Sequence, residues 1–209
     1  MLAPAARSLS LPRDLGPGAG GLAITFDDGP HPEGTPEMLE LLAHARARAT
    51  FFMIGEQVAR RPELAAEVAA AGHRIALHGH RHRLQLRLSA ATVQEDLRRG
   101  REAIAQANGI VPTLHRPPYG IYSADGLECV RAGGMKPLLW SRWGKDWRKL
   151  TTPQRIAFRI TRELAPGDVI LLHDADFYSS HGSHRRTAQA LRLILADAQR
   201  RGIATVLPV

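Results

Sequence analysis

Short runs of β-forming residues alternate with longer segments of helical periodicity from residue 22 to the end of this 209-residue chain. This alternation predicts a mostly parallel sheet joined by helical crossovers, either an open doubly wound sheet or a barrel. We therefore expect an α/β fold with about seven strands. The predicted strands are residues 22–26, 49–54, 74–78, 113–115, 136–140, 169–173 and 203–207.

Capping residues mark the helices between these strands. Thr35 and Thr152 each precede a proline, which is typical of an N-cap followed by the first helical residue. Glycines close three of the segments, as expected at helix C-termini. The predicted helices are residues 36–47, 62–71, 89–108, 124–132, 153–164 and 186–201. Residues 1–20, rich in Pro, Gly, Ala and Arg, are expected to form a loose N-terminal segment before a single domain, 21–209.

The composition is that of an ordinary globular protein, with 44% hydrophobic and 23% charged residues and a net charge of +8. Because the arginines are scattered singly and only three residues are lysines, we expect a solvated surface and no nucleic-acid partner. Peripheral association with anionic envelope polymers remains a second interpretation. One cysteine, Cys129, excludes an intrachain disulfide.

The sequence also bears on localisation. The first twenty residues lack the apolar region of a secretory signal, and no segment is apolar for long enough to span a membrane. The chain as written is therefore expected to be cytoplasmic, or to work at the cell envelope if a longer precursor carries an export signal.

Ionisable residues gather where the predicted strands end. The first strand runs directly into Asp27 and Asp28 and stops at a Gly-Pro pair. The third strand ends at His78 and is followed by His80 and His82. Because the carboxyl ends of parallel strands lie at one edge of a sheet, these side chains should converge.

The spacing of His78 and His82 allows both imidazoles to bind one metal ion, with a carboxylate from Asp27 or Asp28 completing the set. The second carboxylate could then accept a proton from water. His80 could replace either histidine, and surface histidines on a loop are the alternative without a metal.

Three further stretches carry residue types that are suited to catalysis. Arg116 opens a rigid Arg-Pro-Pro-Tyr-Gly turn that can direct its guanidinium at a carboxylate and expose backbone N–H groups. Asp146 precedes Trp147, an acid beside a flat apolar surface. His173 ends a buried strand, where a carboxylate such as Asp146 could orient it to protonate a leaving amine.

These five stretches, in this order, resemble the polysaccharide deacetylases, also called carbohydrate esterase family 4 or the NodB homology domain, over residues 22–206. The resemblance implies a distorted, incomplete (β/α) barrel. It also implies a metal-dependent hydrolase that removes N-acetyl groups from N-acetylhexosamine-containing glycans, such as peptidoglycan or chitin-type oligomers. The implied carbohydrate substrate is thus the expected partner.

The resemblance also implies a metal site. Asp28, His78 and His82 would bind a divalent metal, usually Zn²⁺ although Co²⁺, Mn²⁺ or Ni²⁺ can serve. Asp27 would be the general base, and Arg116 would hold it.

The remaining roles follow from the other motifs of the family. His173 would be the general acid, tuned by Asp146. The backbone N–H of Tyr119 would help to stabilise the oxyanion, and Trp147 and Leu171 would shape the pocket for the acetyl methyl group.

The chain departs from the family pattern at three places. Gly79 stands where the family usually has Ser or Thr, so support for the histidine loop must come from elsewhere. Trp143 stands where many members have an acid, and residues 174–186 form a long polar loop.

Other functions use the same residues. An O-deacetylase, for example on acetylated xylan, or a lipid-linked sugar deformylase needs the same activation of water. A non-catalytic carbohydrate- or anion-binding module on this fold is the alternative from a different class.

Overall fold

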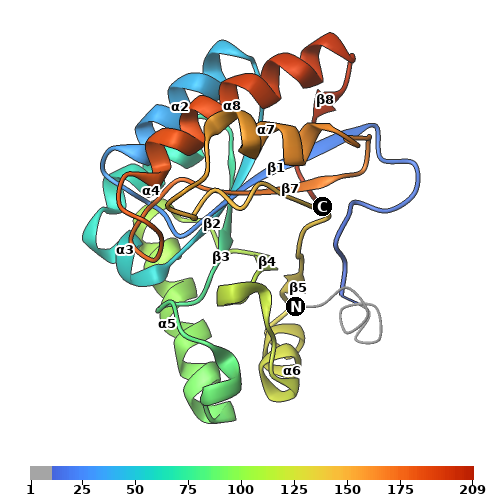
Figure 1. The fold of residues 1–209 in the computed structure, drawn as a ribbon. Coiled ribbons are helices and arrows are strands. Elements are labelled where there is room, and N and C mark those ends of the chain that lie inside the picture. The colour runs from blue at the N-terminus through green and yellow to red at the C-terminus, as the bar shows by residue number, and fades with distance from the viewer. Residues whose placement is uncertain (1–10) are drawn as a thin grey trace.

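One curled parallel sheet forms the centre of the protein (Figure 1), which is described over residues 11–209 by a computed structural model. Its order is β5-β4-β3-β2-β1-β7-β6, and β8 pairs with the start of β1. All of these pairs are parallel, as the alternating pattern predicts. The strands are β1 Gly21–Asp27, β2 Ala49–Met53, β3 Arg74–Leu77, β4 Leu114–His115, β5 Lys136–Pro137, β6 Arg142–Trp143, β7 Val169–His173 and β8 Ala204–Thr205.

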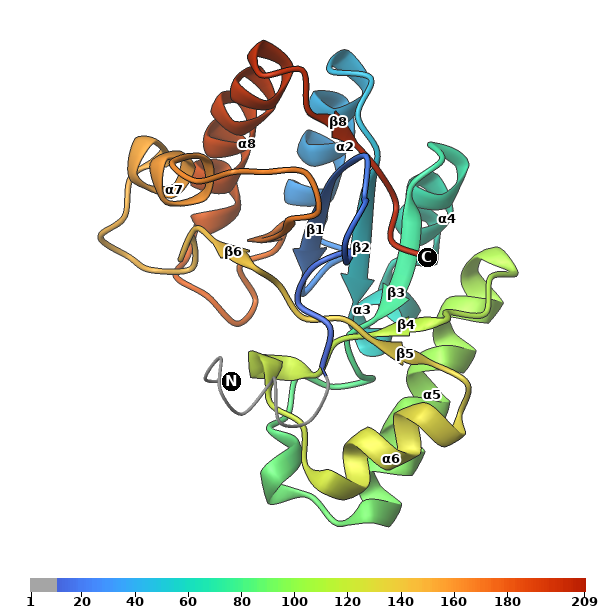
Figure 2. The same ribbon diagram turned by 90° about the vertical axis from the view of Figure 1, so that its right-hand side faces the viewer.

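Helices surround the convex side of this sheet (Figure 2). Neighbouring helices pack in the series α7, α8, α2, α4, α5 and α6, and α3 packs on α5. Their bounds are α2 Gly34–His44, α3 Gly55–Arg60, α4 Pro62–Ala70, α5 Ala90–Asn108, α6 Ala124–Ala132, α7 Pro153–Thr161 and α8 Ser183–Arg200. The fold is therefore the incomplete (β/α) barrel that the resemblance implied.

The open side of the barrel is crossed by one extended segment, residues 136–143. The sequence predicted a single strand over 136–140, but only β5, its first two residues, pairs with β4. The chain then leaves the sheet and pairs again through β6, with β7 on the opposite edge. Between the two strands, the guanidinium of Arg116 binds the carbonyl oxygens of Leu138 and Leu139 at 3.0 and 2.8 Å. A buried side chain thus replaces the neighbouring strand for these carbonyl groups.

Several helix boundaries also differ from the predictions. α2 begins at Gly34 rather than after Thr35, because the Thr35 hydroxyl donates to Asp174 at 2.5 Å instead of capping the helix. α8 begins at Ser183, three residues before the predicted start. α3 was not predicted, since six residues are too few to display helical periodicity. The N-caps of α5 and α7 are Ser89 and Thr152, and Thr152 has the predicted capping role.

The described part of the N-terminal segment packs against the domain. Leu11 is 5% exposed and belongs to the hydrophobic core. The backbone N–H of Leu139 donates to Pro12, and that of Leu15 donates to Gly167. Residues 11–20 are therefore held by the domain, whereas the rest of the predicted loose segment lies outside the described residues. Within residues 11–209, no helix combines the length and apolar character needed to cross a membrane.

Candidate active site

The predicted site residues meet at the carboxyl edge of the sheet. Asp27 ends β1 and is the register partner of His173, which ends the neighbouring strand β7. His78 directly follows β3, and Arg116 directly follows β4. The convergence expected for a parallel sheet therefore holds for these side chains.

Asp28, His78 and His82 form a group suited to a metal ion. Oδ1 of Asp28 lies 3.5 Å from Nε2 of His78 and 3.5 Å from Nε2 of His82. That oxygen is buried and accepts no hydrogen bond. The three ligand atoms lie within 4.8 Å of one another, which a single ion could bridge.

The protonation of the two histidines favours metal binding. Nδ1 of His78 donates to the carbonyl oxygen of Arg116 at 2.8 Å, which leaves the Nε2 lone pair directed at Asp28. Burial lowers the pKa of His78 and of His82 to about 3. Both rings are therefore neutral near pH 7, as a metal ligand must be.

Asp27 is held by a buried arginine. Nη1 of Arg116 donates to Oδ1 of Asp27 at 2.7 Å and to Oγ1 of Thr25 at 2.8 Å. Burial raises the pKa of Asp27, and the positive charge of Arg116 counteracts part of that rise. Arg116 is 0% exposed, so its guanidinium contacts Asp27 and is closed off from the solvent-accessible cavity. A buried carboxylate with its second oxygen free is suited to accept a proton.

His173 and Asp146 form the second pair. Nδ1 of His173 lies 2.9 Å from Oδ1 of Asp146, while Oδ2 accepts from the His173 backbone N–H and from the Thr187 hydroxyl. Burial alone would lower the pKa of His173, but the charge of Asp146 and this hydrogen bond raise it to about 10. Burial acts to raise the pKa of Asp146, but the charge and hydrogen bonds of His173 hold it below its ordinary value. His173 is thus a protonated acid near neutral pH.

One cavity of about 350 Å³ is bordered both by the Asp28, His78 and His82 group and by His173. Arg13, Tyr119, Trp143, Trp147 and Tyr178 line it together with the Asp27, Asp28, His78, His82 and His173 side chains. Trp147 meets the ring of His173 edge-on at 5.8 Å, and Tyr119 meets His82 edge-on at 4.6 Å. Leu171 is 3% exposed within β7 and is not among the lining residues, so its contact with an acetyl methyl stays a prediction.

His80 is separated from this cavity. Its backbone N–H donates to Oδ2 of Asp96 at 2.7 Å, and its ring packs beside Gly55 at the start of α3. It belongs to neither of the side-chain groups that could hold an ion. The structure thus separates His80 from the pair His78 and His82, which the sequence alone left open.

Comparison with known proteins agrees with this geometry. Residues 16–138 match the family model described as polysaccharide deacetylase. This chain belongs to the polysaccharide deacetylase family. A chitooligosaccharide deacetylase from Bradyrhizobium sp. is 34% identical over 192 residues, which cover 88% of this chain and 87% of that protein. A peptidoglycan-N-acetylglucosamine deacetylase from Bacillus cereus is 35% identical over 184 residues, covering 87% and 83%.

The fold of this chain also matches that of a solved structure. The family 4 carbohydrate esterase from Streptomyces lividans, in complex with acetate, matches with a TM-score of 0.81 and 29% identity. The match covers 90% of this chain and 93% of that one.

Asp96 supplies the support that the residue at Gly79 cannot. Its Oδ2 accepts from His80 N–H at 2.7 Å, and its Oδ1 accepts from Arg81 N–H at 3.3 Å and from the Arg83 guanidinium at 2.7 Å. Gly79 has φ +86°, and a Cβ there would lie 3.0 Å from Oδ2 of Asp96. In this member of the family, a carboxylate from α5 therefore holds the loop that carries His78 and His82.

Sequence reasoning missed several side chains of the site. Tyr178 comes from the long loop after β7 and stacks on His82 at 4.2 Å. Trp143, which stands where many members of the family have an acid, stacks on Trp147 at 4.7 Å. Arg13 comes from the segment predicted to be loose. For Trp143 and Tyr178 the only signal in the sequence was an aromatic residue near a predicted motif, which does not show where the side chain points. For Arg13 there was no signal.

A second histidine group, His31, Asp176 and His184, lies outside the cavity. Nδ1 of His31 accepts from the backbone N–H groups of Gly34 and Glu33 at 2.9 and 3.2 Å. In the neutral ring of His31, the proton is therefore on Nε2, which lies 3.3 Å from Oδ1 of Asp176. A protonated Nε2 has no lone pair to offer a metal ion. We interpret this group as a connection between α2, α8 and the loop after β7.

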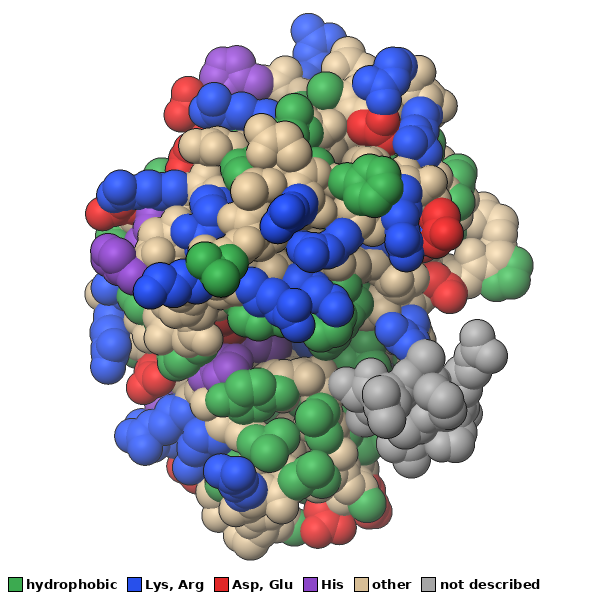
Figure 3. All heavy atoms as spheres, viewed as in Figure 1, with side chains coloured by type: hydrophobic (Ala, Val, Ile, Leu, Met, Phe, Trp, Pro, Cys, Tyr) green, Lys and Arg blue, Asp and Glu red, His purple; other side chains and the backbone are tan. Residues whose placement is uncertain are grey.

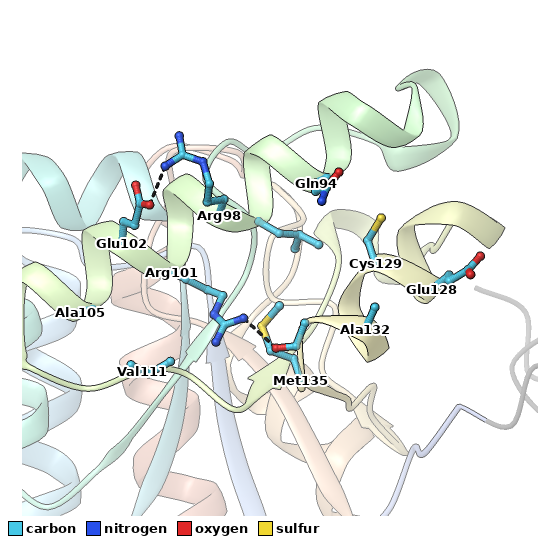
Figure 4. Close-up of a pocket in the computed structure, with 12 residues that line it drawn as sticks. Gln94, Arg98, Arg101, Glu102, Ala105, Val111, Glu128, Cys129, Ala132 and Met135 are labelled. Carbon is cyan, nitrogen blue, oxygen red and sulfur yellow. Dashed lines mark hydrogen bonds and ion pairs between the residues drawn. The ribbon is translucent and has the colours of Figure 1, made fainter.

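A larger cavity, about 650 Å³, lies between α5 and α6 (Figure 4). Arg101 crosses it to the carbonyl oxygen of Gly133 at 2.7 Å, and Cys129 borders it. None of the predicted catalytic or metal-binding residues lines it. Although this cavity is larger than the one at the carboxyl edge of the sheet, its lining does not make it a candidate active site.

Proposed function

We propose that this protein is a metal-dependent hydrolase that removes N-acetyl groups from glycans containing N-acetylhexosamine. One observation carries the proposal: a buried carboxylate, Asp27, and a protonated imidazole, His173, border the same cavity beside a group of metal-ligating side chains. Amide hydrolysis needs a base for water and an acid for the leaving amine, and the cavity offers both.

The proposed metal ligands are Asp28, His78 and His82. Two neutral imidazoles, and a carboxylate oxygen that is buried without a hydrogen bond, support a divalent cation at this place. A set of nitrogen and oxygen ligands suits Zn²⁺, which we propose as the metal, and it also accommodates Co²⁺, Mn²⁺ or Ni²⁺. When bound, the cation supplies Lewis-acid chemistry: it polarises a carbonyl group and makes water a stronger acid.

Asp27 is the proposed general base. Arg116 fixes its Oδ1 and leaves Oδ2 toward His78 at 3.7 Å, so one oxygen is oriented and the other is available. Oδ2 of Asp27 would accept the proton from the attacking water. Arg116 is then a positioning residue, because it sets the place and charge of the base.

His173 is the proposed general acid. Its raised pKa keeps the ring protonated, and Asp146 fixes the ring through Nδ1, which leaves Nε2–H for the leaving nitrogen. An amine leaves only after protonation, whereas an alcohol depends less on an acid. A histidine that Asp146 keeps protonated and oriented therefore favours N-deacetylation over O-deacetylation or the hydrolysis of another ester.

The wall of the cavity has proposed roles in substrate binding. Tyr119 has φ +63° and lies at the cavity, which supports the use of its backbone N–H at the oxyanion. Trp147 offers a flat face for the sugar or the acetyl methyl. Leu171, the register partner of Trp143 on β7, keeps its proposed role at the acetyl methyl. The names of the relatives support chitin-type oligomers and peptidoglycan as the first substrates to try.

The test is acetate release across a panel of glycans: N-acetylglucosamine oligomers, soluble peptidoglycan, acetylated xylan and lipid-linked acetylated sugars, each with and without added metal. We expect release from N-acetylated substrates that depends on metal and is lost in Asp27→Asn. Asp125→Asn is the matched control, because Asp125 is exposed on α6. Turnover restricted to acetylated xylan would reject the N-acetyl specificity. Glycan binding without any acetate release would reject the proposal that the protein is an enzyme.

A further inference from the structure

Six basic side chains gather beside the entrance of the cavity, although their positions along the sequence look scattered. In Figure 3, Lys and Arg side chains cover α7 and the loop before it, and they border the hollow in which histidines are visible. We call this surface the basic lip and define it as Lys145, Arg148, Lys149, Arg155, Arg159 and Arg186.

The fold brings these residues together from two helices and a loop. α7 buries Ile156 and Ile160 in the core, which leaves Arg155 and Arg159, four residues apart, toward the outer side of the helix. Nη1 of Arg159 donates to the carbonyl oxygen of Gly144 at 3.3 Å, and Nη2 of Arg186 donates to that of Arg148 at 3.4 Å. The loop, α7 and α8 therefore form one continuous surface.

The charge of the basic lip is not compensated by the protein. Among the residues that the structure describes, no carboxylate lies within ion-pairing distance of these six side chains, whereas Arg98, Arg142 and Arg185 elsewhere are each paired with an acid. The one acid in the segment 145–162 is Asp146, which is buried and bound to His173. Nε of Arg186 is buried without a hydrogen-bond partner. Uncompensated positive charge at a cleft attracts anionic ligands.

Aromatic side chains connect the basic lip to the cavity. Nζ of Lys145 lies 5.4 Å from the centre of the Trp143 ring, which stacks on Trp147, and both tryptophans line the cavity. Phe158 is 64% exposed on α7 between Arg155 and Arg159. A sugar chain leaving the cavity would thus meet flat rings and cations in turn, and flat rings suit the apolar faces of sugars.

We propose that the basic lip binds carboxylate groups of the same glycan chain whose acetylated sugar occupies the cavity. The enzyme therefore prefers an acidic N-acetylated glycan to a neutral one of equal length. Arginine favours this partner because its guanidinium donates two parallel hydrogen bonds to a carboxylate. This inference rests on the proposed deacetylase function.

The experiment compares one glycan in two forms: soluble peptidoglycan strands with free carboxylates, and the same strands with those groups converted to amides. The variant Arg148→Gln/Lys149→Gln/Arg155→Gln removes three exposed cations of the basic lip. Its matched control, Arg46→Gln/Arg48→Gln/Arg60→Gln, removes three exposed cations outside the basic lip, two of them at the opposite end of the sheet.

We expect wild type to have a lower KM on the acidic strands than on the amidated strands. In the lip variant the ratio of the KM on amidated strands to the KM on acidic strands should fall about tenfold, because each exposed charge contact contributes modestly. The control variant should keep the preference, and added salt should weaken it in wild type. An equal change in KM on the amidated strands, or an unchanged preference, would overturn the proposal. Selective loss of binding to polyphosphate, with the glycan preference intact, would also overturn it by assigning the surface to phosphate.

A binding measurement separates this inference from the proposed function. Sedimentation of Asp27→Asn with insoluble acidic and amidated glycan reports the basic lip without requiring turnover. Stronger binding to the acidic form that the triple lip substitution abolishes supports the inference even if no acetate is released. Equal binding to both forms rejects it even if the enzyme is active.

Discussion

At the scale of single residues, the site separates adjacent side chains by the partners that the fold gives them. Asp27 and Asp28 are neighbours in sequence, but Arg116 binds the first while the second faces His78 and His82. The backbone causes this separation, because Asp28 has φ +83° and leaves the direction of β1. Identical carboxylates thus receive different proposed roles, one as base and one as metal ligand.

Metal content should distinguish the ligands from the acid. Asp28→Ala and His82→Ala remove donor atoms from the proposed ion and should abolish stoichiometric metal, whereas His173→Ala should retain it. Turnover of His173→Ala should fall by about 10²- to 10⁴-fold, the usual contribution of a general acid. Elemental analysis after gel filtration measures the first effect, and acetate release measures the second. Metal retained in His82→Ala but lost in His173→Ala would reverse our assignment.

The pH dependence should report the pair His173 and Asp146. The acid form of His173 is present below its pKa and is lost as pH rises through it, so activity should fall on the alkaline side. Asp146→Asn removes the charge that raises this pKa, so the alkaline limb should move to lower pH. A profile of kcat against pH for wild type and variant measures the shift. An unmoved limb, or one displaced to higher pH, would contradict the role of Asp146.

Asp96 should act on the metal through the histidine loop. Asp96→Asn keeps the shape of the side chain but removes the charge that binds His80 N–H, Arg81 N–H and Arg83. We expect metal affinity to fall by about 10- to 100-fold, as for other groups that orient metal ligands. Competition with a chromogenic chelator gives the affinity, and Asp125→Asn is the control. Unchanged affinity would show that the loop does not need Asp96.

At the scale of elements, the strands and helices predicted correctly are those whose own residues carry a clear pattern. β1, β2 and β7 are continuous buried runs, and the predicted strands overlap them closely. The strand predicted over 136–140 was wrong beyond residue 137, because the carbonyl groups of Leu138 and Leu139 bind Arg116, which lies 22 and 23 residues upstream. No local sequence pattern records that partner. The early start of α8 lies in a polar loop without periodicity. Local rules succeed where local partners dominate.

The start of α5 offers a stability test at this scale. The Ser89 hydroxyl accepts from the backbone N–H of Thr92 and caps the helix that carries Asp96. Ser89→Ala should lower the free energy of unfolding by about 1 kcal/mol, and Ser89→Asp, another good cap, should retain it. Urea denaturation followed by circular dichroism measures both. Equal stability of the Ala and Asp variants would show that this cap contributes nothing.

At the scale of the whole molecule, the motifs predicted which residues meet, because a parallel sheet brings its carboxyl ends to one edge. The motifs could not predict residues that arrive from other layers. Thr187 reaches Asp146 from α8, Tyr178 reaches His82 from the loop after β7, and Arg13 comes from the N-terminal segment. Their positions depend on how helices and loops pack over the sheet, which has no signature within a single motif.

The gathering of basic side chains also belongs to this scale. The sequence interpretation favoured a solvated surface because the arginines are scattered. α7 packs against α8, and Arg159 on α7 and Arg186 on α8 bind the carbonyl oxygens of Gly144 and Arg148 in the preceding loop. Charge that looks dispersed along a chain can therefore become one surface next to the cavity.

The most direct test of the central claim is acetate release from an N-acetylglucosamine oligomer by protein that has been stripped of metal and then reloaded. Stripped wild type should be inactive, and one equivalent of Zn²⁺ should restore release in step with metal bound. Asp27→Asn should bind the same equivalent without recovering activity. Full activity in the stripped protein, or in reloaded Asp27→Asn, would contradict the account.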